Sequence, residues 1–227
     1  MSEYNYVGSE LDVFAKAVRW KTYWRSILAQ SISGDVLEVG AGIGANTGLL
    51  AALPVKSWTC LEPDPQLCAR IPRDPARTII NGTVADLPQV PTYDSIIYID
   101  VLEHIEHDRA ELEAAFQRLR PGGHLSVLGP AHQGLFTPFD KAIGHYRRYS
   151  KTSLRDVGPA RARLVRLAYL DSAGMLASLG NRLFLKQSSP TQQQILTWDR
   201  FLVPISRRLD PLFGFAVGKS VVAVWTA

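Results

Sequence analysis

The sequence predicts one α/β domain built around a mostly parallel, doubly wound sheet. Short runs rich in Val, Ile and Leu alternate with helical patterns along the chain. A glycine-rich turn joins the first of these runs to the helix that follows it. The length of 227 residues, with 46% hydrophobic and 20% charged residues, suits a single globular domain.

The glycine-rich turn is the feature around which the rest of the chain is organised. Residues 36–39 are predicted to form a buried strand and residues 45–53 a helix, with Gly40, Gly42 and Gly44 between them. Glycine allows a sharp turn and lets a ligand approach the main chain closely. The helix presents free N–H groups and a positive dipole end to that ligand. The stretch therefore predicts a site for a nucleotide-type cofactor.

The other elements follow from periodicity, and two segments are interpreted as additions to the sheet. Further strands are predicted over residues 57–62, 78–80, 93–100, 124–128, 164–170 and 220–225, and helices over 8–32, 108–119, 151–157, 173–185 and 194–209. In the last helix Ile195, Trp198, Leu202, Ile205 and Leu209 share one face, and residues 130–150 are predicted to form a long irregular loop. Residues 1–33 are interpreted as an N-terminal helical cap and residues 173–215 as a helical insertion over the site, within a single domain 1–227.

Composition narrows the range of partners. The net charge of +4 permits an anionic substrate or surface, but without a run of Lys and Arg no nucleic acid is expected. Cys60 and Cys68 form no disulfide framework. With no signal peptide and no apolar run of about 18 residues, we expect a cytoplasmic monomer or homodimer. Peripheral membrane contact through Phe201, Leu202, Phe213 and Phe215 is a weaker expectation than ordinary packing.

A further residue helps to identify the cofactor. Gly40, Gly42 and Ala45 satisfy a dinucleotide fingerprint only loosely, whereas Glu38 completes the pattern E-x-G-x-G-x-G. The stretch resembles that of the class I S-adenosylmethionine (SAM)-dependent methyltransferases, in which the acidic residue and the glycine loop hold the methionine end of SAM. The resemblance implies a Rossmann-like sheet of seven strands with an antiparallel last strand. An NAD(P)-dependent oxidoreductase and a non-catalytic SAM-binding scaffold stay open as alternatives.

Residues at the ends of later strands extend the expected cofactor site. Glu62, followed by Pro63, ends the second strand about 20 residues after the glycine loop, where a carboxylate can accept from both ribose hydroxyls. The resemblance places Asp86 and Leu87 at the adenine. Asp100 ends the fourth strand at the same edge of the sheet, where we also expect it to meet the cofactor.

Histidines and acids near Asp100 are the candidates for chemistry. His104, His132 and His145 could each accept a proton from the acceptor, and we assign catalysis to His104 and His145. Asp100-x-x-Glu103-His104 resembles the E-x-x-E-H element of small-RNA 3′-terminal 2′-O-methyltransferases and ubiquinone-pathway O-methyltransferases, where two acids and two histidines hold a divalent metal. That resemblance implies a metal on Asp100, Glu103, His104 and His145. The shorter Asp100 argues against it, so SAM is the expected cofactor and a metal an unfavoured addition.

The acceptor is expected to bind the segment before residue 151. His132, Tyr146, Arg147 and Arg148 are assigned to it. The two arginines could bind an anionic group bidentately or form a solvated charge pair. Trp20, Lys21 and Tyr23 either close the cofactor mouth or simply pack. The resulting hypothesis is methyl transfer from SAM to a small-molecule or lipid-linked acceptor, at oxygen rather than nitrogen.

Overall fold

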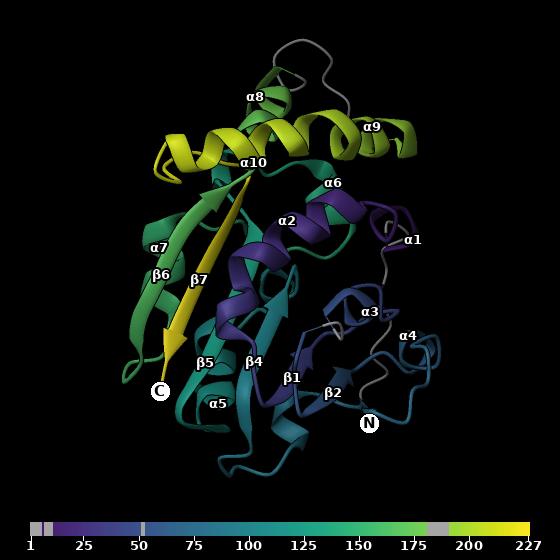
Figure 1. Cartoon of the computed structure of the whole chain (residues 1–227), viewed down its shortest axis with the longest axis vertical. Coiled ribbons are helices and arrows are strands. Elements are labelled where there is room, and N and C mark those ends of the chain that lie inside the picture. Colours follow the sequence, from purple (N-terminus) through teal and green to yellow (C-terminus); the bar gives the residue numbers. More distant parts are fainter. Residues whose placement is uncertain (1–5, 7–10, 51–52, 181–190) are drawn as a thin grey trace.

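The computed structural model describes residue 6 and residues 11–50, 53–180 and 191–227. Its sheet has seven strands in the order β3-β2-β1-β4-β5-β7-β6 (Figure 1). These are β1 Asp35–Val39, β2 Ser57–Glu62, β3 Arg77–Asn81, β4 Tyr93–Ile99, β5 Leu119–Pro130, β6 Arg163–Leu170 and β7 Ser220–Thr226. The first five strands pair in parallel, and β7 pairs antiparallel with β5 and β6. The predicted fold class, a seven-stranded and mostly parallel sheet with an antiparallel last strand, is confirmed.

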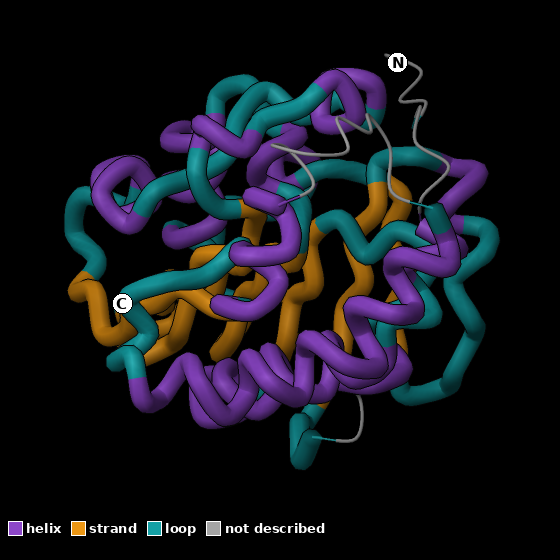
Figure 2. The backbone as a smooth tube through the Cα atoms, turned by 90° about the horizontal axis from the view of Figure 1, so that it is seen from above, coloured by secondary structure: helices purple, strands orange, loops and turns teal. Residues whose placement is uncertain are grey.

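Helices cover both faces of the sheet, as the tube view in Figure 2 shows. They are α1 Leu11–Phe14, α2 Val18–Leu28, α3 Thr47–Leu50, α4 Pro65–Cys68, α5 Asp108–Phe116, α6 Pro138–Ala142, α7 Lys151–Val157, α8 Ser172–Gly180, α9 Gln192–Thr197 and α10 Val203–Leu212. Alternate strand residues point to opposite faces. Val36 and Ile97 pack in the core beneath α2, whereas Leu37 and Tyr98 pack in the core with α5 and α7.

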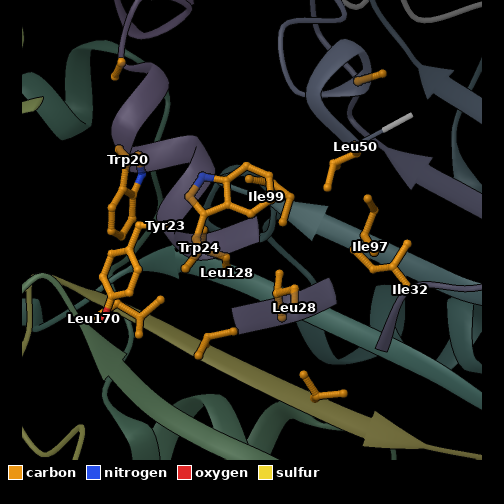
Figure 3. Packing of buried hydrophobic residues seen from close by; sticks show 14 of the residues in the cluster. Trp20, Tyr23, Trp24, Leu28, Ile32, Leu50, Ile97, Ile99, Leu128 and Leu170 are labelled. Carbon is orange, nitrogen blue, oxygen red and sulfur yellow. The ribbon is translucent and has the colours of Figure 1, made fainter. Parts of the chain in front are cut away.

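Helix α2 lies against the sheet through a row of large side chains. Trp20, Tyr23, Trp24 and Leu28 are buried, and Figure 3 shows them beside the strand residues. The predicted single helix over residues 8–32 is wrong, because α1 ends at Phe14 and α2 begins at Val18. The carboxylate of Asp199 accepts from the backbone N–H groups at positions 19 and 20, at 3.2 and 2.8 Å. This distant carboxylate supplies the cap that Ala17 lacks.

The helix predicted over residues 194–209 is interrupted in the structure, and its second half packs through a different face from the predicted one. A π-helical segment, Trp198–Leu202, separates α9 from α10. A π-turn carries an extra residue, which rotates the following helix. The side chains of Val203, Ser206 and Asp210 therefore pack inward, whereas Ile205 is 43% exposed. No helix within the described ranges has the length and apolarity to cross a membrane.

Several other boundaries differ from the prediction. The helix after the glycine loop is described only over Thr47–Leu50, and residues 51–52 lie outside the described part, as do 8–10 of the N-terminal helix and 181–185 of the helix now α8. Strand β5 starts at Leu119, and its pairing with β4 breaks over residues 120–123, where Gly122 has φ 79°. Residues 130–150 contain helix α6 as well as irregular chain. Helix α7 follows Ser150, whose side chain caps it by accepting from the N–H of Ser153.

Candidate active site

A cavity of about 1040 Å³ opens at the carboxyl ends of the parallel strands. The glycine loop, the segment after β4, helix α2, the residues around α6 and the helices α8 and α9 with the π-helical segment all contribute to its wall. Aromatic side chains make up much of the lining: Phe14, Trp20, Trp24, Phe136, Phe139 and Trp198. Charged and imidazole groups gather in the same wall: Lys21, Asp100, Glu103, His104, Asp140, His145, Arg148 and Lys219. The cavity can therefore hold a molecule that is largely apolar but carries a reactive polar group.

The glycine loop has the backbone conformation that its sequence predicts. Gly40, Gly42 and Gly44 have φ values of 66°, 57° and 74°. A Cβ on Gly40 would lie 2.6 Å from a methyl of Val101, so only glycine fits there. The N–H of Gly42 donates to Oε2 of Glu62 at 2.7 Å, and Oε1 of Glu62 accepts from the N–H of Asp64 at 2.9 Å. Glu62 thus holds the ends of β1 and β2 together at the edge of the loop.

Glu38 lies beneath the loop and does not line the cavity. Its Oε2 accepts from Thr47 Oγ1 at 2.6 Å and from Trp58 Nε1 at 2.9 Å. The side chain is 2% exposed, and burial raises the pKa of Glu38 to about 7. This carboxylate therefore positions α3 against β2 in the structure. Lys21 lies at the loop instead, donating to the carbonyl of Ala45 at 3.2 Å.

The residues predicted for the adenine do not line the cavity. The exposed carboxylate of Asp86 accepts from both the N–H and the hydroxyl of Thr83, at 2.8 Å each, which lowers the pKa of Asp86. Leu87 is buried in the core, and Pro63 follows β2. Tyr6, which the sequence analysis did not single out, donates its backbone N–H to Asp64 at 2.7 Å, and its ring centroid lies 5.7 Å from that of His104.

The predicted catalytic residues come together. The side chains of Glu103, His104 and His145 each offer a ligand atom within 4.8 Å of the others. A hydrogen bond from the N–H of Tyr146 to the carbonyl of Glu103, at 2.8 Å, joins the two chain segments. Burial lowers the pKa of His104 to about 3, so its imidazole is neutral at neutral pH. Asp100, with φ 54°, faces the same cavity, and its desolvated surroundings raise the pKa of Asp100 to about 6.

Glu103 is unusual among these groups. It is fully buried, and neither carboxylate oxygen forms a hydrogen bond with any described part of the chain. Burial, reinforced by the nearby charge of Asp100, raises the pKa of Glu103 well above its ordinary value. A buried carboxyl group without partners points to a missing proton donor, water or cation.

Asp140 is a site residue that the sequence analysis missed. Its Oδ1 lies 3.0 Å from Nδ1 of His145, while both carboxylate oxygens accept from the guanidinium of Arg148 at 2.8 and 2.9 Å. Burial opposes ionisation, but the bonds from His145, Arg148 and Thr137 outweigh it, and the pKa of Asp140 lies below its usual range. The capping-box spacing Thr137-x-x-Asp140, which marks the start of α6, was the sequence feature that could have drawn attention to Asp140.

Of the four residues predicted to bind the acceptor, Arg148 alone lines the cavity. Arg147 pairs with Asp108 at 2.6 Å, Tyr146 is 52% exposed, and Nε2 of His132 lies 3.0 Å from the carbonyl of Gly218. Neither arginine is simply solvated, the second of the two alternatives for this pair, because each binds a carboxylate of the chain. Lys219, which was not predicted, lines the cavity with its Nζ 5.1 Å from the centroid of the Trp198 ring.

Residues 37–125 match the family model described as a methyltransferase domain. This range contains the glycine loop, Glu62, Asp86 and the Glu103-His104 pair. This match, together with the strand order of the sheet, identifies a SAM-dependent methyltransferase with the class I fold. SAM is therefore the methyl donor, and the dinucleotide oxidoreductase alternative falls away. No curated protein matches the methyltransferase in sequence.

Solved structures share the fold of the methyltransferase over nearly its whole length. A chain from the Haloferax volcanii complex between a methyltransferase activator and a putative methyltransferase has a TM-score of 0.64 at 14% identity, over 96% of this chain and 94% of that one. A SAM-dependent methyltransferase from Archaeoglobus fulgidus has a TM-score of 0.60 at 12% identity, over 96% and 97%. The N-methyltransferase NodS from Bradyrhizobium japonicum, in complex with S-adenosylhomocysteine, has a TM-score of 0.57 at 16% identity, over 96% and 89%. At these identities the likeness extends to the fold alone.

Proposed function

We propose that this methyltransferase transfers the methyl group of SAM to a hydroxyl oxygen of a largely apolar small molecule, with His145 as the general base. The contact between Asp140 and His145 carries the proposal. A carboxylate on Nδ1 fixes the tautomer in which Nδ1 holds the proton, leaving the lone pair of Nε2 free to accept one. The imidazole of His145 lines the cavity, and Nε2 lies 3.9 Å from Oε1 of Glu103, too far for a hydrogen bond, so an acceptor hydroxyl would be its hydrogen-bond partner.

The glycine loop and its neighbours are the proposed SAM site. Gly40, Gly42 and Gly44 let the methionine part approach the main chain, and the ammonium group of Lys21 offers a partner for its carboxylate. Glu62 would accept from the ribose hydroxyls, because each of its oxygens has a lone pair beyond the backbone bond it already makes. Glu38 supports this site from beneath.

Other residues are proposed to contact the adenine and the acceptor-facing side of SAM. Pro63, Asp86 and Leu87 are assigned to the adenine, and Asp100 to the side of SAM that faces the acceptor. SAM supplies an activated methyl group, so the protein has to align the acceptor oxygen with it and exclude water between them.

The acceptor is proposed to occupy the aromatic part of the cavity. Residues 173–215 supply Trp198 and Leu202 to its wall, and we assign acceptor choice to this segment. Arg148 and Lys219 offer positive charge at the cavity wall, whereas His132, Tyr146 and Arg147 would contact only an acceptor that extends past the rim. The size and lining suit either a soluble aromatic molecule or a lipid-linked one. An amine acceptor would need no base, so the Asp140–His145 pair favours oxygen over the nitrogen on which NodS acts.

A divalent metal is the second candidate for activating the hydroxyl. Glu103, His104 and His145 fit such an ion, since Glu103 has two unpartnered oxygens and His145 has a carboxylate on its other ring nitrogen, as metal-bound histidines commonly do. Asp100 lines the same part of the cavity. A bound ion would lower the pKa of the acceptor hydroxyl. Without a bound ion, His145 would remove the proton from the acceptor hydroxyl by itself.

A panel of matched acceptors tests the proposal. Each pair offers the same aromatic or prenyl-like skeleton with a hydroxyl group in one member and an amine in the other, and S-adenosylhomocysteine release is followed. We expect the hydroxyl member of at least one pair to be methylated faster, and His145→Ala to abolish that preference. Methylation of amines alone, unaffected by His145→Ala, would contradict both the base and the choice of oxygen.

A further inference from the structure

The outer face of α10 and of the π-helical segment before it carries a row of exposed apolar side chains. Phe201, Ile205 and Leu212 are 56%, 43% and 78% exposed. Their spacing of four and seven residues places them on one side of the helix, and Arg208 falls on the same side. The opposite side of α10 packs against the rest of the protein, because Val203, Ser206 and Asp210 are buried against α2 and α8. Figure 1 shows α9 and α10 running across one end of the molecule, beyond the strand ends.

Positive charge accompanies this row. Arg200, Arg207 and Arg208 are exposed. The two acids of residues 191–216 are both buried, Asp199 capping α2 and Asp210 accepting from the hydroxyl of Tyr23 at 2.7 Å. The exposed ionised side chains of this segment therefore all carry the same sign. An apolar stripe flanked by arginines and free of exposed acid is complementary to a surface of anionic lipid headgroups.

We propose that this face, defined by Arg200, Phe201, Ile205, Arg208 and Leu212, docks the enzyme on an anionic phospholipid bilayer. The register shift of the π-helical segment creates the face, because it turns Phe201 and Ile205 outward while Trp198 and Leu202 line the cavity. Bilayer contact and acceptor binding thus belong to the two sides of one helical layer. Of the membrane contacts expected from sequence, Phe201 and Phe213 are exposed, whereas Leu202 and Phe215 face inward.

This inference deepens the proposed function, since docking would bring a lipid-linked acceptor to the cavity. Membrane binding can nevertheless be measured without turnover. The full-length protein is sedimented with vesicles of phosphatidylcholine containing 30% phosphatidylglycerol, and with pure phosphatidylcholine vesicles. We expect binding to the anionic vesicles, weakened by added salt, and at least tenfold weaker binding to the neutral ones.

Paired variants connect any binding to this face. Phe201→Ser/Leu212→Ser should reduce partitioning about tenfold or more, because two exposed apolar side chains no longer enter the interface. Its control is Val90→Ser/Val165→Ser, which changes exposed apolar residues elsewhere. Arg200→Ser/Arg208→Ser should also reduce partitioning about tenfold or more. Its control, Arg161→Ser/Arg163→Ser, removes the same net charge from exposed positions elsewhere.

Three outcomes would overturn the inference. The first is absence of binding to anionic vesicles by a folded, SAM-binding protein. The second is equal loss of binding in test and control pairs, which would indicate net charge or general stickiness rather than this face. The third is a homodimer in sedimentation equilibrium that Phe201→Ser/Leu212→Ser dissociates, which would make a second copy the occupant. His145→Ala should bind vesicles normally, so failure of the proposed catalysis would not be mistaken for failure of docking.

Discussion

Nδ1 of His145 lies 3.0 Å from Oδ1 of Asp140, a residue five positions earlier whose two carboxylate oxygens also accept from the guanidinium of Arg148. Asp140 is buried, with only 1% of its surface exposed. A base oriented in this way keeps its ring fixed before the acceptor arrives, with Nε2 on the side of Glu103, whose Oε1 lies 3.9 Å away. Preorganisation of this kind lowers the cost of aligning proton transfer with methyl transfer.

Removing the base should lower turnover without affecting the cofactor. We expect His145→Ala to reduce kcat about 10²–10⁴-fold for a hydroxyl acceptor. Asp140→Asn should reduce it in the same direction, because the amide no longer selects the tautomer. SAM affinity, measured by calorimetry, should stay within about twofold because neither residue belongs to the proposed SAM site. The exposed His107 provides the control, and His107→Ala should behave as wild type. Full activity in His145→Ala would rule out the base.

Chelation separates the base from the metal. If His145 acts alone, dialysis against EDTA should leave turnover unchanged, and elemental analysis should find less than one equivalent of any divalent ion. If Glu103, His104 and His145 hold an ion, EDTA should abolish turnover and the ion should restore it. Glu103→Gln then distinguishes the two mechanisms again, since loss of the carboxylate would weaken metal affinity about 10-fold or more. Metal content of the purified variants gives a readout independent of activity.

Glu62→Ala should weaken SAM binding about tenfold or more. The substitution removes the proposed ribose contacts, and charge-assisted hydrogen bonds are worth roughly 1.5–3 kcal/mol each. It also frees the N–H of Gly42 and so loosens the loop. Calorimetric titration with SAM gives the affinity, and Glu106→Ala, at an exposed position outside the proposed SAM site, controls for loss of charge. An unchanged affinity in a folded Glu62→Ala protein would remove Glu62 from the cofactor site.

Glu38 should make stability depend on pH. Its pKa is raised from 4.5 to about 7 in the folded protein, so the folded state binds the proton more tightly than the unfolded state does. Its contribution is therefore fully present below about pH 4.5 and is lost as pH rises through about 7. Glu38→Gln keeps an acceptor for Thr47 and Trp58 but cannot ionise. The stability of this variant relative to wild type should thus improve by roughly 2–3 kcal/mol between pH 4.5 and 8.

Urea unfolding at pH 4.5 and pH 8 measures this difference. The comparison isolates Glu38, because the other buried carboxyl groups titrate in both proteins. A constant difference between Glu38→Gln and wild type at the two pH values would show that the Glu38 carboxyl group ionises as easily in the folded protein as in the unfolded chain.

The sequence by itself determined the fold and the location of the cofactor chemistry. Short β-branched runs alternating with helices specify a parallel sheet, because each pattern matches only one period of side-chain burial. Gly40, Gly42 and Gly44 specify the turn, since their positive φ values exclude most other residues. The edge of the sheet on which Asp100, Glu103 and His104 would lie followed from strand direction alone.

Only the tertiary structure determined those features of the site and of the helices that depend on contacts between distant parts of the chain. The pairing of Asp140 with His145 and Arg148 is local in sequence, yet its position over Glu103 depends on how the segment after β5 packs against the one after β4. The start of α2 depends on Asp199, about 180 residues away. The outward turn of Ile205 depends on a π-helical segment that periodicity cannot reveal, because one inserted residue per turn changes the packed face without changing the composition.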